Sequence, residues 1–163
     1  MNHMNEMIER ITRHPCFREM APEQKCILTE GAKEARFEPG EVLFRMGEPA
    51  NAFYLIENGS IALEVHDASQ TTRLIQKVNA GEVLGWSWLF PPFTWHFTAR
   101  ALEPTTVIVL SGAHLLVAAE RDHEFGFELM KRIAQIVIQR LQATRKCLLT
   151  SMRDEASAKP VES

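Results

Sequence analysis

The sequence predicts a mainly β protein with flanking helices, in which about eight short strands lie between helical ends. Between residues 35 and 110, short apolar runs alternate with turn residues at regular intervals. Asn58–Gly59 separates two such runs, and this dipeptide is the strongest short-range signal for a β-hairpin. After Ser111 the apolar spacing becomes helical. Many short strands with glycine turns indicate a sandwich, a jelly roll or a small barrel.

The helical N-terminal part consists of two predicted segments. Residues 5–13 carry Met7, Ile8 and Ile11 at helical spacing and end at His14–Pro15. Residues 21–33 form the second predicted helix, which has Pro22 in its first turn. Its expected buried side holds Cys26, Ile27 and Leu28. Neither segment carries catalytic chemistry, so we expect them to cover a sheet.

The predicted strands are short apolar runs, each of which ends at turn residues. Glycine, proline or asparagine residues in these turns reverse the chain. The runs are residues 36–37, 42–44, 53–56, 61–65, 73–78, 83–84, 95–101 and 106–110.

The C-terminal part predicts a short helix over residues 112–120, with Ser111 as N-cap, and a long one over residues 124–151. The long helix would run about 40 Å. One apolar stripe, expected against the sheet, holds Leu129, Ile133 and Ile136. The second stripe has coiled-coil spacing and holds Met130, Ala134, Val137, Leu141, Thr144 and Leu148. We expect a homodimer through residues 124–151; the alternative is that both stripes pack within one monomer. The polar tail, residues 152–163, is expected to be disordered.

Composition and charge exclude several classes of protein. The chain has 163 residues, 45% hydrophobic and 24% charged, with a net charge of −3. Such a balance provides no basic surface for nucleic acid. No apolar run approaches the roughly 20 residues of a membrane-spanning helix, and the N-terminus has no secretory signal. We expect one cytoplasmic domain with neither membrane nor DNA as a direct partner.

Residues with metal or catalytic chemistry form no recognisable motif. Cys16, Cys26 and Cys147 are isolated, which argues against a disulfide framework or an iron–sulfur site. The 6 histidines include no His-x-His pair. No nucleophile motif or phosphate-binding P-loop occurs. We therefore expect no enzyme, no metal and no cofactor.

Four stretches together resemble the cyclic nucleotide-binding domain, the sensor part of Crp/Fnr regulators. They are PGEVLFRMGEPANAFYLIENGSIAL (39–63), AGEVLG (80–85), TARALEPTTVIVLS (98–111) and RLQATR (140–145). The resemblance implies one sensor domain over residues 1–151, with N-terminal helices (5–33), a β-roll of jelly-roll type (35–110) and C-terminal helices (112–151). It also implies a small-molecule ligand and a role in signal transduction. Because no helix-turn-helix segment follows the long helix, direct DNA binding is not expected.

The resemblance places a ligand pocket between a phosphate-binding cassette and the long helix. The equivalent residues are Gly85, Trp86, Ser87, Trp88, Trp95, His96 and Phe97 in the cassette, and Arg140, Thr144 and Arg145 in the helix. In the family, a glutamate follows the glycine and accepts from the ribose, and an arginine holds the phosphate. Here those positions are Trp86 and Trp95. An indole offers one N–H donor and no acceptor, so neither can replace the charged group.

Alternation through residues 95–101 would place Trp95 and Phe97 on one face, with His96 and Arg100 on the other. A register shift at Pro91–Pro92 would instead turn His96 inward. The tryptophans either fill the old ligand space as core or line an aromatic pocket. Thr144 is equally explained as a ligand contact or as part of a dimer seam.

These observations lead to three functional hypotheses. The first is a non-enzymatic small-molecule sensor with a degenerate, aromatic-rich cassette. The second is a genuine binder of cyclic AMP or cyclic GMP with a cassette rebuilt from backbone donors, His96 and Arg145. The third is a dimeric interaction scaffold without a ligand. A haem sensor, known among relatives, would need His96 or Cys147 as axial ligand.

Overall fold

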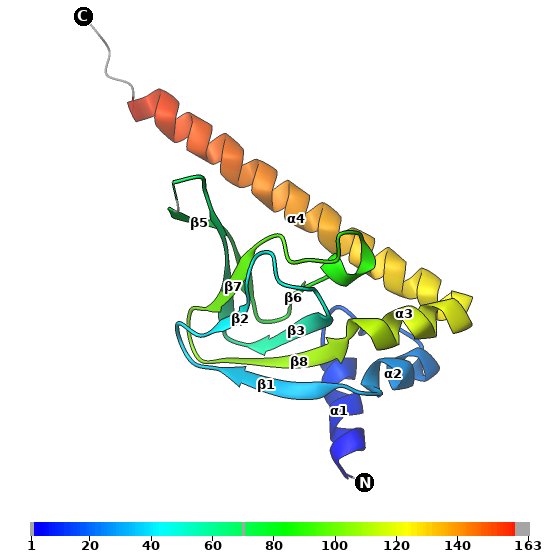
Figure 1. Cartoon of the computed structure of the whole chain (residues 1–163). Helices are drawn as coiled ribbons and strands as arrows, with labels where there is room; N and C mark the ends of the chain where they lie inside the picture. The colour runs from blue at the N-terminus through cyan, green and yellow to red at the C-terminus, as the bar shows by residue number, and fades with distance from the viewer. Residues whose placement is uncertain (1, 70, 159–163) are drawn as a thin grey trace, which may run out of the picture.

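The computed structural model describes residues 2–69 and 71–158, and it places a β-roll between N-terminal helices and one long C-terminal helix (Figure 1). The helices are α1 (Asn2–Arg13), α2 (Pro22–Thr29), the 3-10 helix η1 (Ser87–Leu89), α3 (Gly112–Arg121) and α4 (His123–Ala158). The strands are β1 (Lys33–Phe37), β2 (Val42–Phe44), β3 (Ala52–Asn58), β4 (Ser60–His66), β5 (Thr72–Asn79), β6 (Val83–Leu84), β7 (Thr98–Ala101) and β8 (Thr105–Ser111).

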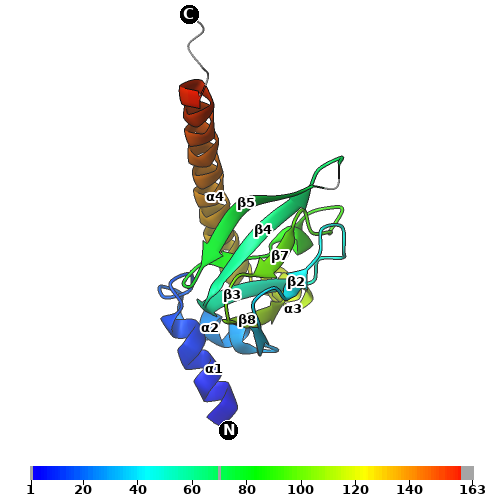
Figure 2. The ribbon, with the colours of Figure 1, turned by 90° about the vertical axis from the view of Figure 1, so that its left-hand side faces the viewer.

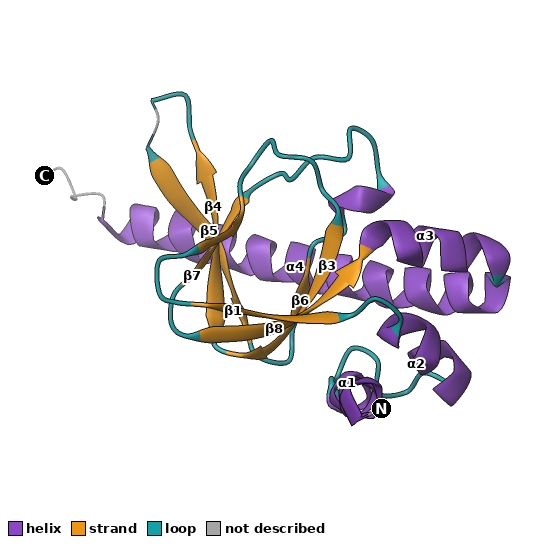
Figure 3. Cartoon of the chain, turned by 60° about the horizontal axis from the view of Figure 1, so that its bottom comes forward, coloured by secondary structure: helices purple, strands orange, loops and turns teal. Residues whose placement is uncertain are grey.

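The eight strands form two antiparallel sheets, which confirms the predicted jelly-roll class. One sheet has the order β1-β8-β3-β6 and the other β2-β7-β4-β5. Figure 3 shows the strands in orange and the helices in purple. The predicted turn at Asn58–Gly59 is confirmed, because Gly59 alone separates β3 from β4. The predicted hairpin is wrong, because β3 and β4 belong to different sheets and do not pair. Gly59 has a φ of 97°, and a Cβ there would lie 2.3 Å from the Thr105 hydroxyl oxygen. Only glycine fits this turn, because the φ and the space both exclude a side chain.

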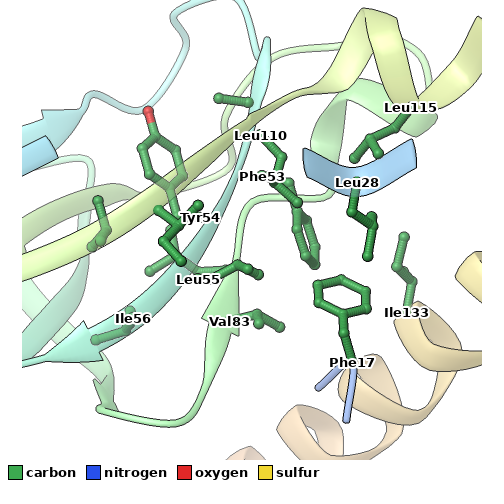
Figure 4. Close-up of a cluster of buried hydrophobic side chains, with 14 of the residues drawn as sticks. Phe17, Leu28, Phe53, Tyr54, Leu55, Ile56, Val83, Leu110, Leu115 and Ile133 are labelled. Carbon is green, nitrogen blue, oxygen red and sulfur yellow. The ribbon is translucent and has the colours of Figure 1, made fainter. Parts of the chain in front are cut away.

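The core extends from the roll to the helices on both ends of the chain. Phe53 of β3 meets Phe17 from the α1–α2 connection, with ring centroids 6.2 Å apart. Leu28 of α2 and Ile133 of α4 close the same cluster (Figure 4). Met7 of α1 is also buried. The N-terminal helices therefore cover a sheet, as predicted.

The second N-terminal helix is shorter than predicted. It ends at Thr29 instead of residue 33, because Gly31 adopts a φ of 76° and the chain then enters β1 at Lys33. Cys26 is exposed, so its predicted burial is wrong. The buried side of α2 is formed by Leu28 and Thr29.

The predicted strand over residues 95–101 is also shorter, because β7 begins only at Thr98. The preceding segment is a loop that runs along the β2–β3 connection. The Gly47 N–H donates to the Trp95 carbonyl at 2.9 Å, and the Trp95 N–H donates to the Glu48 carbonyl at 2.9 Å. Loop–loop pairing thus holds Trp95 in place of a regular sheet ladder.

Helix α4 buries one of its two apolar stripes. Leu129 and Ile133 are buried and Ile136 packs against the core, as predicted. In the second stripe, Leu141 and Leu148 are 66% and 61% exposed, which contradicts packing of both stripes within one monomer. Figure 2 shows α4 projecting beyond the roll.

The helix also continues past its predicted end at residue 151, through Ala158. Prediction of a disordered tail is therefore wrong for residues 152–158, while residues 159–163 lie outside the described part of the chain. Among the described residues, no helix combines the length and apolar character that crossing a membrane requires.

Candidate functional site

The turn after β6 begins at the glycine where the family resemblance places the cassette. Gly85 has a φ of 94° and leads into η1. A Cβ at Gly85 would lie 2.8 Å from the Ala52 carbonyl oxygen and 3.1 Å from the Trp95 ring. Glycine is needed for its conformation and for close packing at once.

Trp95 fills the interior of the roll. Its side chain is only 3% exposed, and its ring stacks on Phe44 with centroids 3.8 Å apart. The Tyr54 ring is also close, with its centroid 6.3 Å from that of Trp95. Phe44 and Tyr54 also contact each other, with ring centroids 5.7 Å apart, so the Trp95 indole is a core side chain in a cluster of three aromatic rings.

Trp88 fastens η1 to the rest of the fold. Its Nε1 donates to the Gly85 carbonyl at 2.6 Å, which satisfies its one polar group. Its ring meets Phe53 edge-on, with centroids 6.2 Å apart. At Gly112, the start of α3, a Cβ would lie 2.7 Å from the Trp88 ring. Gly112 thus leaves the room that Trp88 needs.

Trp86 and Arg140 meet across the boundary between cassette and long helix. The Arg140 guanidinium lies 5.1 Å from the centre of the Trp86 ring, a cation–π arrangement. Its Nη2 also donates to the Val83 carbonyl. Burial lowers the pKa of Arg140 to about 10, so the group remains charged at neutral pH. This contact ties α4 to the end of β6.

The remaining predicted site residues are not brought together. Ser87 is buried and Phe97 is half-buried, but His96, Thr144 and Arg145 are exposed. The inward Trp95 and outward His96 agree with the predicted alternation, without a register shift that turns His96 inward.

Arg100 also faces away from the pocket position. Its Nε donates to Glu64 at 2.9 Å and its Nη1 donates to the Gly40 carbonyl at 2.9 Å. The predicted outward direction of Arg100 is thus confirmed, and its guanidinium is engaged on that side.

A cavity of about 430 Å³ lies beside α4, outside the cassette. Its walls come from α4, the α1–α2 connection and the β5–β6 turn. Arg132, Gln139 and Arg140 line the α4 side. Sequence reasoning missed the cavity, although one signal was present: Arg140 continues the buried spacing of Leu129, Ile133 and Ile136. A cation on that face must meet the roll or the α1–α2 connection.

The next question is where the candidate metal and haem ligands lie in the structure. Residues 2–69 and 71–158 contain no group of three or more His, Cys, Asp or Glu side chains placed to hold a metal. His96 and Cys147, the candidate haem ligands, are both exposed. Burial raises the pKa of the Cys16 thiol to about 12, which disfavours a reactive thiolate.

The family profile of the cyclic nucleotide-binding domain matches residues 34–122. The chain belongs to the cyclic nucleotide-binding domain family. The matched residues span the two sheets and α3. Membership supports a ligand-sensing module, and the family is typically regulatory rather than catalytic.

Individual relatives agree with this assignment. A Geobacter metallireducens structure, described as a cyclic nucleotide-binding protein, is 27% identical and has a TM-score of 0.73, covering 82% of this chain and 96% of that one. The sensor domain of the transcriptional regulator DNR from Pseudomonas aeruginosa shares the fold at 19% identity and a TM-score of 0.69, covering 87% of this chain and 95% of that domain. The Rhodopseudomonas palustris protein RPA4233, which bears the name of a potassium channel protein, is 27% identical over 78% of this chain. The chain spans only 29% of that protein.

Proposed function

We propose that this chain is a non-enzymatic small-molecule sensor whose family pocket no longer accepts a cyclic nucleotide. The packing of Trp95 on Phe44 carries this conclusion, because an indole occupies the position at which relatives hold a phosphate-binding arginine. Trp86 similarly stands at the ribose-binding position and stacks on Arg140. The cassette keeps its turn but not its two charged groups.

The cost of burying a phosphate supports this proposal. A charged group transferred into a protein interior is strongly disfavoured unless a partner charge meets it. Neither Arg100 nor Arg140 extends into the aromatic cluster around Trp95: Arg100 pairs with Glu64, and Arg140 contacts Trp86 and the Val83 carbonyl. His96 and Arg145 are exposed, which disfavours the rebuilt cassette.

Isothermal titration calorimetry with cyclic AMP and cyclic GMP tests this proposal. We expect no binding of either nucleotide tighter than about 1 mM, which corresponds to about 4 kcal/mol. The matched variant Trp86→Glu/Trp95→Arg restores the two family side chains and shows whether they are the missing groups. Micromolar binding by the unchanged protein would overturn the proposal and favour a genuine cyclic nucleotide receptor.

We further propose that the sensor is a cytoplasmic homodimer joined through α4. The stripe holding Leu141 and Leu148 is exposed along a helix that extends past the roll, and coiled-coil spacing favours a second helix as its cover. Analytical ultracentrifugation should give a dimer for the unchanged chain and a monomer for Leu141→Glu/Leu148→Glu. A monomeric unchanged protein would refute this assembly.

A ligand-free dimeric scaffold is the second candidate, and the filled roll interior favours it. The two candidates differ in one measurable respect. A sensor changes its stability when a cognate small molecule binds, whereas a scaffold does not. Thermal-shift screening of the dimer against a metabolite set separates them, with the monomeric Leu141→Glu/Leu148→Glu variant as control.

A further inference from the structure

The cavity beside α4 is built from polar and charged side chains. Arg132 and Arg140 line it together with the amides of Gln76, Gln135 and Gln139. Arg18, Glu19 and Glu82 line it as well, so three arginines and two glutamates leave one net positive charge. Its volume of about 430 Å³ lies within the usual range for small-molecule sites, about 300–1,000 Å³. None of the cassette residues 85–97 contributes to its walls. The cavity is thus separate from the cassette, and Arg140 alone of the predicted pocket residues borders it.

The two arginines hold N–H groups that lack partners. Arg132 donates from Nη1 to the Cys16 carbonyl at 3.0 Å, and its Nη2 lies 3.7 Å from a Glu128 oxygen, but its buried Nε has no acceptor. Arg140 uses Nη2 for the Val83 carbonyl, and its buried Nε and Nη1 have none. Buried unpaired donors are rare and costly in folded proteins. The Arg140 cation also has no carboxylate within ion-pair distance among the described residues.

We propose that this cavity is a second ligand site, for a small organic or inorganic polyoxyanion carrying carboxylate or phosphate groups. Guanidinium groups match such oxyanions with two parallel N–H donors, and the three glutamine amides can bind further oxygens. The unpaired N–H atoms are covered, so a bound oxyanion draws the two guanidinium groups toward the cavity by side-chain rotation. This site goes beyond the sensor function proposed above and does not depend on it.

A partner helix on the apolar stripe would leave this cavity free. Gln139 lines the cavity, whereas Leu141 belongs to the exposed stripe. Two residues along an α-helix are separated by roughly 200°, so these side chains point to opposite flanks of α4. Dimerisation through the stripe and occupation of the cavity are therefore compatible.

Arg140 connects the cavity to the cassette, because the same guanidinium lines the cavity and stacks on Trp86. An oxyanion that draws Arg140 away from the indole should change the environment of Trp86. Tryptophan fluorescence therefore gives a local signal of binding, and Trp86→Phe should remove that signal without abolishing binding.

Calorimetric titration of the full chain with sodium citrate and with sodium pyrophosphate tests the site, each against KCl of matched ionic strength. We expect at least one probe to bind with a Kd below about 1 mM. Arg132→Gln should weaken binding about tenfold or more. Gln139→Glu provides a variant at an exposed position, where folding is retained and the added carboxylate competes for the arginines. Arg121→Gln removes an exposed arginine at the end of α3 and should leave binding unchanged.

Each outcome decides the proposal. Binding of citrate alone would assign carboxylate ligands to the site, and binding of pyrophosphate alone would assign phosphate ligands. Either result supports the site. Absence of binding above the KCl reference overturns it, as does equal weakening by Gln139→Glu and Arg121→Gln. Backbone NMR shifts confined to residues 85–97 would also overturn it and place the anion in the cassette. The cyclic nucleotide titration remains an independent test of the sensor proposal.

Discussion

The interior of the roll and the flank of α4 are opposite kinds of environment. Around Trp95 the roll is packed with aromatic rings, and the one polar group of buried Trp88 is hydrogen-bonded. Beside α4, a cavity is lined by arginines whose N–H groups remain unpaired. Packed apolar surface gains stability from being filled, whereas unpaired donors gain stability from a ligand. The flank of α4 therefore suits a polar ligand better than the packed surroundings of Trp95 do.

Truncation of Trp95 should have the largest effect. Trp95→Ala removes a buried ring and its stack on Phe44, so we expect a loss of about 3–5 kcal/mol in the free energy of unfolding. Urea denaturation monitored by circular dichroism measures it. Trp86→Ala, at a half-buried ring, is the matched control and should cost clearly less. Equal losses in the free energy of unfolding for the two variants would contradict a filled roll interior that differs from the flank of α4.

Crowding of Trp88 should have the next largest effect. Gly112→Ala would place a Cβ 2.7 Å from the indole, so we expect a loss of about 1–3 kcal/mol from overpacking. Thermal and urea unfolding measure it. Since a smaller ring relieves the clash, the double variant Gly112→Ala/Trp88→Phe should lose less than the sum of the single variants. Additive losses would show that α3 does not press on this ring.

The contact between Trp86 and Arg140 should contribute less. A double-mutant cycle with Trp86→Ala and Arg140→Gln should give a coupling energy of about 0.5–2 kcal/mol, as expected for a partly desolvated cation–π pair. Trp86→Ala paired with Arg145→Gln provides the comparison, because Arg145 is exposed on the same helix. Equal coupling in both cycles would contradict a specific link between cassette and α4.

A pH-dependent contribution from His14 should be the smallest effect. Its Nδ1 accepts from the Cys16 N–H at 3.3 Å, and its Nε2 lies 3.2 Å from the Ile56 carbonyl oxygen. Burial lowers the pKa of His14 below the ordinary value near 6.5, so the unfolded chain takes up the proton first. Stability is full above that value and falls as the pH drops through it toward the lower pKa of the folded state.

The free energy of unfolding, measured with urea, should decline between about pH 7.5 and pH 5, the range in which histidine ordinarily titrates. His14→Gln should flatten the decline, whereas the exposed His96→Gln should leave it in place. An unchanged slope in His14→Gln would assign the pH dependence to other groups.

Much of the fold was predictable because local chemistry dictated it. Asn58–Gly59 predicted the turn between β3 and β4, and the helical spacing of Leu129 and Ile133 identified the buried side of α4. The hairpin expected at that turn does not form, because the two strands enter different sheets. Errors arose where a tertiary contact replaced a local preference. The segment before Thr98 is apolar like a strand, but it pairs with the β2–β3 connection as a loop. Gly31 ended a helix that apolar spacing alone would have continued.

Some features of the candidate site were likewise predictable from the sequence, and others depend on tertiary contacts. The sequence alone predicted the family and the turn at Gly85, since each is a matter of residue type at a given spacing. The resemblance to the family also predicted that Trp86 and Trp95 stand at two charged positions. Only the tertiary structure decided that Trp95 fills the roll while Trp86 meets Arg140. The cavity beside α4 likewise depends on three segments distant in sequence. Ring packing and unpaired donors are properties of groups brought together by folding, and no local pattern encodes them.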